Sequence, residues 1–125
     1  MAGMMLPENS LEVVRGSSRT LELTVTDQDS KPVDLTGSRI IFSVKTSASD
    51  PLPLIQKTTD FPAQAEVTVP REGKARIYLQ PGDTQGLQAL EYVFDVWVVL
   101  TSGKRYPVVP SSIFAVKPGV TLIPL

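Results

Sequence analysis

The chain has no cysteine and no histidine among its 125 residues. Without cysteine it can form neither a disulfide framework nor a thiolate metal site, and its redox compartment stays undetermined. Without histidine it lacks the usual general base, the Ser-His and Cys-His nucleophile pairs and the common zinc ligand sets. We therefore expect a protein that is not an enzyme, has no catalytic residues and uses no cofactor or metal.

The chain also has neither an excess of one sign of charge nor a long apolar run. The 12 basic and 13 acidic residues give a formal charge of -1. The sequence therefore shows no excess of basic residues that would indicate a nucleic-acid partner. No run approaches the roughly 18 apolar residues of a membrane span. The opening residues MAGMMLPENS have neither the basic nor the apolar region of a signal peptide. We expect no nucleic-acid partner and no membrane insertion.

The apolar segments that are present are short and separated by turns. The length suits one domain, and most of the 11 prolines lie between apolar runs. The residue patterns predict strands at Leu11–Val14, Thr20–Thr26, Ser38–Thr46, Leu54–Thr58, Ala65–Val69, Ala75–Leu79, Glu91–Leu100, Arg105–Val109 and Ile113–Val116. They predict an all-β, Ig-like antiparallel β-sandwich of about seven to nine strands at 11–117, with an apolar N-terminal arm at 1–10 and an apolar C-terminal tail at 118–125.

The segment Glu91–Leu100 is expected to form the central strand, because it contains the single tryptophan and neither glycine nor proline. One face of this strand is apolar, with Tyr92, Phe94, Val96, Val98 and Leu100, and the other is mixed, with Glu91, Val93, Asp95, Trp97 and Val99. Tyr92 is either the corner tyrosine of an Ig-like sandwich or a simple core aromatic. Trp97 is either covered by a neighbouring loop or the N-terminal arm, or shares an interaction surface with Val93 and Val99.

Acidic residues provide only weak signals of chemistry. A glycosidase-type pair of carboxylates is formally possible, but the candidates lie in predicted turns, where aspartate is favoured for backbone reasons: Asp27, Asp29, Asp50, Asp60 and Asp83. The start of a calcium loop at Asp27-x-Asp29 is followed by Lys31 at the third ligand position and by Pro32 in place of the turn glycine. A single helical turn is expected within 81–90, with Asp83 or Thr84 as its N-cap.

The run Pro32-Val33-Asp34-Leu35-Thr36-Gly37, followed by an alternating strand at 40–45, is the most specific motif of the chain. Further pieces accompany it at Val14-Arg15-Gly16-Ser17, 25–31, Gly73-Lys74-Ala75, 79–84, the strand of Tyr92, Ser102-Gly103-Lys104, 114–118 and Val120-Thr121. Together, over about four fifths of the chain, they resemble a family of tailed-phage structural proteins, best represented by the N-terminal domain of siphophage baseplate upper proteins. Those proteins continue into coiled-coil or receptor-binding regions, so the resemblance does not extend to a baseplate hub role.

The resemblance implies a virion structural component of the tail, baseplate, neck or capsid surface, assembled in the host cytoplasm. Its expected partners are other phage structural proteins and copies of itself. The candidate interaction surface comprises Met4, Met5, Leu6, Val93, Trp97, Val99, Val120, Leu122, Ile123 and Leu125. The apolar ends would be costly to leave in water, and donation to a neighbouring subunit removes that cost. The alternative is a carbohydrate-binding module that uses Trp97 or Tyr78 as a stacking platform for a cell-wall sugar.

Overall fold

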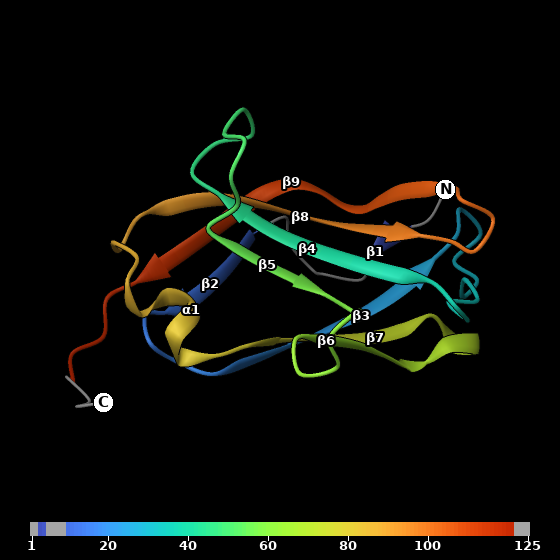
Figure 1. Ribbon diagram of the computed structural model, residues 1–125, viewed down its shortest axis with the longest axis horizontal. Helices are drawn as coiled ribbons and strands as arrows, with labels where there is room; N and C mark the ends of the chain where they lie inside the picture. Colours follow the sequence, from blue (N-terminus) through green and yellow to red (C-terminus); the bar gives the residue numbers. More distant parts are fainter. Residues whose placement is uncertain (1–2, 5–9, 122–125) are drawn as a thin grey trace.

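Two β-sheets packed face to face make up the described part of the chain, which is residues 3–4 and 10–121 of a computed structural model (Figure 1). The strands are β1 (Gly3–Met4), β2 (Ser10–Val14), β3 (Arg19–Thr26), β4 (Arg39–Lys45), β5 (Ile55–Thr58), β6 (Ala65–Val69), β7 (Lys74–Leu79), β8 (Glu91–Val99) and β9 (Arg105–Lys117). A 3-10 turn, η1 (Pro70–Glu72), joins β6 to β7, and a short helix, α1 (Pro81–Gln85), precedes β8.

The strand order is that of an immunoglobulin-type sandwich. The four-stranded sheet (the β7 sheet) has the order β1-β3-β7-β6, and the five-stranded sheet (the β8 sheet) has the order β2-β9-β8-β4-β5. These orders match the ABED and GFC sheets of the fold, with β2 and β5 added at the two edges of the β8 sheet. The predicted Ig-like sandwich is confirmed, and Glu91–Val99 lies at the centre of its sheet. Strand β5, which follows two prolines, is an edge strand.

The N-terminal segment departs from the prediction in two ways. Gly3–Met4, expected in an arm outside the sandwich, forms β1 and pairs with β3. The predicted antiparallel pairing is wrong for β2, which runs parallel to β9 from Ser10↔Ile113 to Val14↔Lys117. The two strands lie near opposite ends of the described chain, with β3 to β8 between them, so no hairpin constrains them to be antiparallel. Short-range sequence patterns do not reveal such a pairing.

The last strand also differs from the prediction, which placed two strands at Arg105–Val109 and Ile113–Val116. The structure has one continuous strand, β9, with irregular register against β8. Phe94 pairs with Ser112 and Val96 with Val109, so Asp95 alone faces two residues of β9. This β-bulge takes up Pro110, which has no N–H for the ladder, without ending the strand.

Three phenylalanines on neighbouring strands form the centre of the core. The rings of Phe42, Phe94 and Phe114 lie 5.7 to 6.3 Å apart, with tilted or edge-to-face geometry, which is favourable for aromatic pairs. Phe94 is two residues after Tyr92, where antibody domains carry a cysteine, and Phe42 lies on the strand that carries their buried tryptophan. Aromatic packing therefore takes the place of the disulfide and tryptophan of antibody domains.

Tyr92 is the corner tyrosine of the fold rather than a simple core aromatic. Its buried hydroxyl donates a hydrogen bond to the carbonyl oxygen of Gln88, at 2.9 Å. The predicted helical turn exists as α1, but its predicted N-cap is wrong. Gln80 is the N-cap, and the Asp83 carboxylate at position N3 accepts the backbone N–H of Gln80 at 2.7 Å. Pro81 at the first helical position starts the helix before Asp83, because its backbone angle is already helical.

The motif Pro32-Val33-Asp34-Leu35-Thr36-Gly37 closes one end of the core. Leu35 is fully buried, and Asp34 accepts hydrogen bonds from the backbone and hydroxyl of Thr36 at 2.9 and 2.6 Å. These bonds hold the pKa of Asp34 below its usual value. Gly37 has a φ of 71°, a conformation that favours glycine. The most specific sequence motif is thus a hydrogen-bonded turn that places Leu35 in the core.

Candidate functional site

The outward face of the β7 sheet is polar and internally paired. Arg76 donates to the Glu22 carboxylate at 2.9 Å, and the Tyr78 hydroxyl donates to Glu66. The Glu66 carboxylate raises the pKa of Tyr78, because it stabilises the phenol proton, and burial and the negative charge add to the effect. This face has the pattern of a sheet that is exposed to water on one side.

The outward face of the β8 sheet is different, because apolar side chains lie on both sides of the polar pair Ser43↔Asp95 at its middle. The cross-strand pairs Ile41↔Trp97 and Val93↔Ile113 lie on it, beside Val99. Trp97 is 38 % exposed and Ile113 is 43 % exposed. We call the surface of Ile41, Val93, Trp97, Val99 and Ile113 the outer apolar face. A solvated sheet face usually carries more polar residues than these five positions do.

One face of β8 is buried and the other is partly exposed, as the alternation of residues predicted. Tyr92, Phe94, Val96 and Val98 are buried between the sheets, whereas Val93 and Val99 are only half-buried and Trp97 is exposed. Leu100 is half-buried and packs against the core. The indole Nε1 of Trp97 donates to the Asp95 carboxylate at 3.0 Å, so the polar atom of the ring is satisfied while the ring stays accessible.

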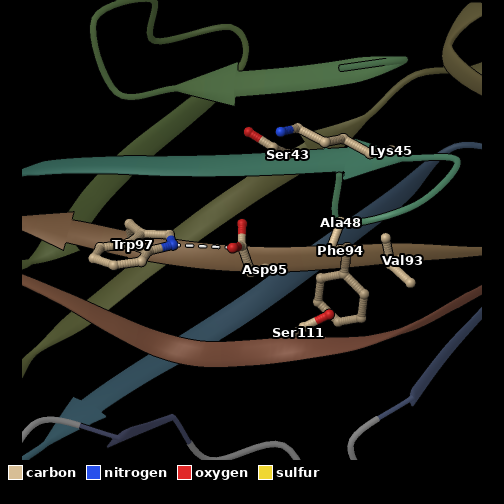
Figure 2. A pocket seen from close by; sticks show the side chains of 8 residues that line it. All are labelled: Ser43, Lys45, Ala48, Val93, Phe94, Asp95, Trp97 and Ser111. Atoms are coloured by element: carbon tan, nitrogen blue, oxygen red, sulfur yellow. Dashed lines mark hydrogen bonds between the residues drawn. The ribbon is translucent and has the colours of Figure 1, made fainter. Parts of the chain in front are cut away.

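A depression of about 270 Å³ lies beside Trp97 on this face (Figure 2). Its lining comes from three separate segments: β8, the end of β4 with the loop that follows it, and the bulge of β9. The lining residues are Ser43, Lys45, Ala48, Val93, Phe94, Asp95, Trp97 and Ser111. Phe94 borders it although its side chain is buried in the core. The site thus combines an aromatic ring with a carboxylate, an ammonium and two hydroxyls.

A second depression lies on the other side of Trp97. It is lined by Arg39, Ile41, Trp97, Val99, Gly103 and Arg105. Arg39 is held by Asp60 through a salt bridge of 2.6 Å. Trp97 is therefore shared between two adjoining depressions, one with a carboxylate and one bordered by guanidinium groups.

Four of the five carboxylates that could have suggested catalysis or calcium binding, all except Asp29, make hydrogen bonds or salt bridges with structural roles. Asp27 accepts the backbone N–H groups of Asp29 and Lys31, and Asp50 accepts that of Leu52. Asp83 caps α1 and forms a 2.8 Å salt bridge with Lys57. Within residues 3–4 and 10–121, no group of three or more acidic side chains gathers as a metal site would require, and no helix has the length and hydropathy of a membrane span.

The remaining candidate residues lie at the two ends of the chain. Met4 belongs to β1, and Val120 is fully exposed. Met5, Leu6, Leu122, Ile123 and Leu125 lie outside the described residues. The sequence reasoning missed the exposed Leu52, which is 72 % accessible in the loop between β4 and β5. The prolines on both sides of Leu52 were the sequence signal that it lies in a loop.

Comparisons with known proteins establish the fold and no family. No family model matches the chain, and no curated protein matches its sequence. Among solved structures, CopC of Methylosinus trichosporium matches with a TM-score of 0.54 and 15 % identity over 98 % of this chain and 100 % of CopC. Murine CRIg has a TM-score of 0.45 and 11 % identity, covering 95 % and 98 %.

The sialic acid binding region of a Streptococcus sanguinis adhesin also has a TM-score of 0.45, with 13 % identity over 94 % of this chain and 30 % of the adhesin chain. None of these three structures is named as a phage protein. At such identities the likeness concerns the fold alone. The chain is therefore an Ig-like β-sandwich, and its function has to be argued from its own surface.

Proposed function

We propose that the protein is a non-enzymatic structural component of a tailed-phage virion and acts through protein–protein assembly. Two lines of support are independent of each other. The motif at 32–37 and its accompanying segments resemble the N-terminal domain of siphophage baseplate upper proteins. The absence of histidine and cysteine removes the side chains best suited to neutral-pH catalysis. The tail, baseplate, neck and capsid surface are all compatible locations.

The observation that carries the assembly role is the contrast between the two outward faces. The β7 sheet pairs its own charges, as Glu22 with Arg76, whereas the β8 sheet presents the outer apolar face. Burying a face of this kind against another subunit removes apolar surface from water. Trp97 is the expected anchor, because tryptophan dominates binding energy at the centre of interfaces. Other phage structural proteins or copies of the same chain are the expected partners.

Mass spectrometry of purified virions tests this proposal. The protein should be present at a stoichiometry typical of structural components, and cross-linking should connect the outer apolar face to a neighbour. A particle assembled with Trp97→Ala should contain less of the protein, whereas Tyr78→Ala, on the opposite face, should be incorporated normally. Absence of the protein from purified virions would refute the virion role.

A second candidate is a carbohydrate-binding module, favoured by the polar groups that converge beside Trp97. An indole ring next to Asp95 and Lys45 offers stacking together with hydrogen-bond acceptors and donors. Tyr78 lies on the other sheet and its hydroxyl is bound to Glu66, so the two aromatic rings cannot form one platform. A glycan array should then give binding that Trp97→Ala abolishes and Tyr78→Ala preserves. An array with no such signal removes this candidate.

A further inference from the structure

The second depression beside Trp97 is the larger of the two and has an apolar floor. Its volume is about 680 Å³, compared with about 270 Å³ for the first depression. Its apolar lining consists of Trp97, Ile41, which pairs with Trp97 across β4 and β8, and Val99. We call it the Arg105 depression, after the arginine at its border. A floor of this composition suits an apolar side chain of a ligand.

Two arginines border this floor on opposite sides of β8. Val99 of β8 pairs with Arg39 of β4 on one side and with Arg105 of β9 on the other. Neighbouring strands lie about 4.8 Å apart, so the backbones of the two arginines are separated by roughly 10 Å. Both side chains line the same depression. A group that lies over Val99 is therefore within reach of a guanidinium from either side.

The charges at this border are not balanced. Asp60 neutralises Arg39, since it accepts Nε at 2.9 Å and forms a salt bridge of 2.6 Å. Arg105 forms no ion pair within the described residues. The Arg105 depression has no acidic residue in its lining, because Asp95 lines the other depression. One positive charge is thus uncompensated, and a carboxylate is its natural complement.

The shape of the depression favours part of a protein over a small molecule. Trp97 is 38 % exposed and the Arg39 side chain is 50 % exposed, so the depression is open to solvent. Sites for small molecules enclose most of the surface of their ligand, whereas this surface covers a ligand from one side. Tryptophan and arginine are also the residues that contribute most to binding between proteins.

We propose that the Arg105 depression docks an acidic segment of a partner protein, in which an aspartate or glutamate is adjacent to a large apolar residue. The apolar side chain packs on Trp97, and the carboxylate binds Arg105, with Arg39 on its other side. This inference rests on the proposed assembly role and names the chemistry of the partner. The carbohydrate candidate concerns the other depression, with Asp95 and Lys45, so variants can separate the two.

Phenylbutyrate and its neutral analogue phenylbutyramide test the site on the full chain. The fluorescence of Trp97, the single tryptophan, reports their binding. Phenylbutyrate should bind roughly fivefold more tightly than the amide, because its carboxylate reaches Arg105. Arg105→Gln should abolish this preference and leave amide binding unchanged. Lys45→Gln is the matched control, because it removes a cation from the other depression, and it should retain the preference.

Incorporation into particles tests whether the ligand is a protein. Particles assembled with Arg105→Gln should contain less of the protein, whereas Lys45→Gln should be incorporated normally. Circular dichroism of both variants confirms that they fold.

Three results of the titration would overturn the inference: no binding of phenylbutyrate, equal affinity for acid and amide, or a preference that survives Arg105→Gln. Normal incorporation of Arg105→Gln would overturn the assignment of a protein partner, even where the probe binds. Absence of the wild-type protein from virions refutes the virion role instead. The titration needs no virion, so it still decides whether the depression selects carboxylates.

Discussion

Phe94 illustrates how single residues stabilise a sandwich that has no disulfide. Its ring lies 5.7 Å from that of Phe42 and 6.1 Å from that of Phe114, and it is 3 % exposed. A disulfide constrains the unfolded chain, but aromatic packing acts only in the native state. The stability of this protein must therefore depend strongly on the volume of a few core side chains.

Phe94→Ala is expected to lower the free energy of unfolding by about 3 to 5 kcal/mol, because it removes buried apolar area and leaves a cavity between the sheets. Denaturant titration followed by circular dichroism measures the change. Phe61→Ala is a suitable control, since Phe61 is 59 % exposed and its truncation should change stability far less. Equal effects of the two substitutions would contradict the central position of Phe94.

Tyr78 provides a prediction of pH dependence. Its pKa is raised above the ordinary value of 10.0, mainly because its hydroxyl donates to the Glu66 carboxylate. A raised folded-state pKa means that the stabilisation is present below the unfolded pKa and is lost as pH rises through the folded value. Glu66→Gln should lower the pKa of Tyr78, as measured by tyrosinate absorbance with Tyr78→Phe as the reference. Identical titrations of wild type and Glu66→Gln would rule out this coupling.

At the scale of elements, the sheets are joined through the corner before β8. Lys57 on the edge strand β5 reaches the Asp83 carboxylate of α1 at 2.8 Å, and its side chain is only 8 % exposed. Thr84 of the same helix accepts the backbone N–H of Gly16 at 2.8 Å. The short helix thus connects an edge strand with the turn before β3. Local sequence patterns contain no signal for such long-range contacts.

Asp83→Ala should destabilise the protein by roughly 3 to 5 kcal/mol, because it leaves a buried ammonium group without a partner. The double variant Lys57→Met with Asp83→Ala should be more stable than Asp83→Ala alone, since the uncompensated charge is gone. Thermal unfolding of wild type and the three variants, including Lys57→Met alone, gives the coupling energy. Additive effects would show that the ion pair does not connect β5 to α1.

At the scale of the whole molecule, the two faces of β8 lie in different environments. Buried residues of β8 hold the sheets together, whereas Trp97 on the same strand contacts solvent. Both environments occur on one strand because alternate side chains point to opposite faces. Substitutions on the two faces should therefore have different consequences.

Trp97→Ala is expected to cost only about 1 kcal/mol of stability, because the ring is 38 % exposed and its indole bond is made at the surface. Assembly, in contrast, should fail. Chemical denaturation of the purified variant and its incorporation into particles separate the two effects. If Trp97→Ala unfolds the isolated domain, Trp97 belongs to the core and the division of faces is wrong.

The strands could be predicted from the sequence because alternation of apolar and polar residues is a local signal. The inward position of Phe94 and the outward position of Trp97 follow from the same signal, whereas the hydrogen bond of Tyr92 to Gln88 was needed to identify the corner tyrosine. The parallel pairing of β2 with β9 could not be predicted, since it joins strands near opposite ends of the described chain. The N-cap of α1 was misplaced because Pro81 and Gln80 begin the helix before the favoured acidic residue.

The sequence by itself determined the fold class, the core face of each strand and the lack of histidine and cysteine chemistry, because these depend on composition and on residues close in the chain. Only the tertiary structure decided that Ile41 and Ile113 lie beside the outward side chains of β8 and where this face is hollowed. That face brings together β4, β8 and β9, and its depression exists because the β4–β5 loop and the β9 bulge meet beside Trp97. Contacts between segments that are distant in the sequence depend on sheet order and register, which no local pattern specifies.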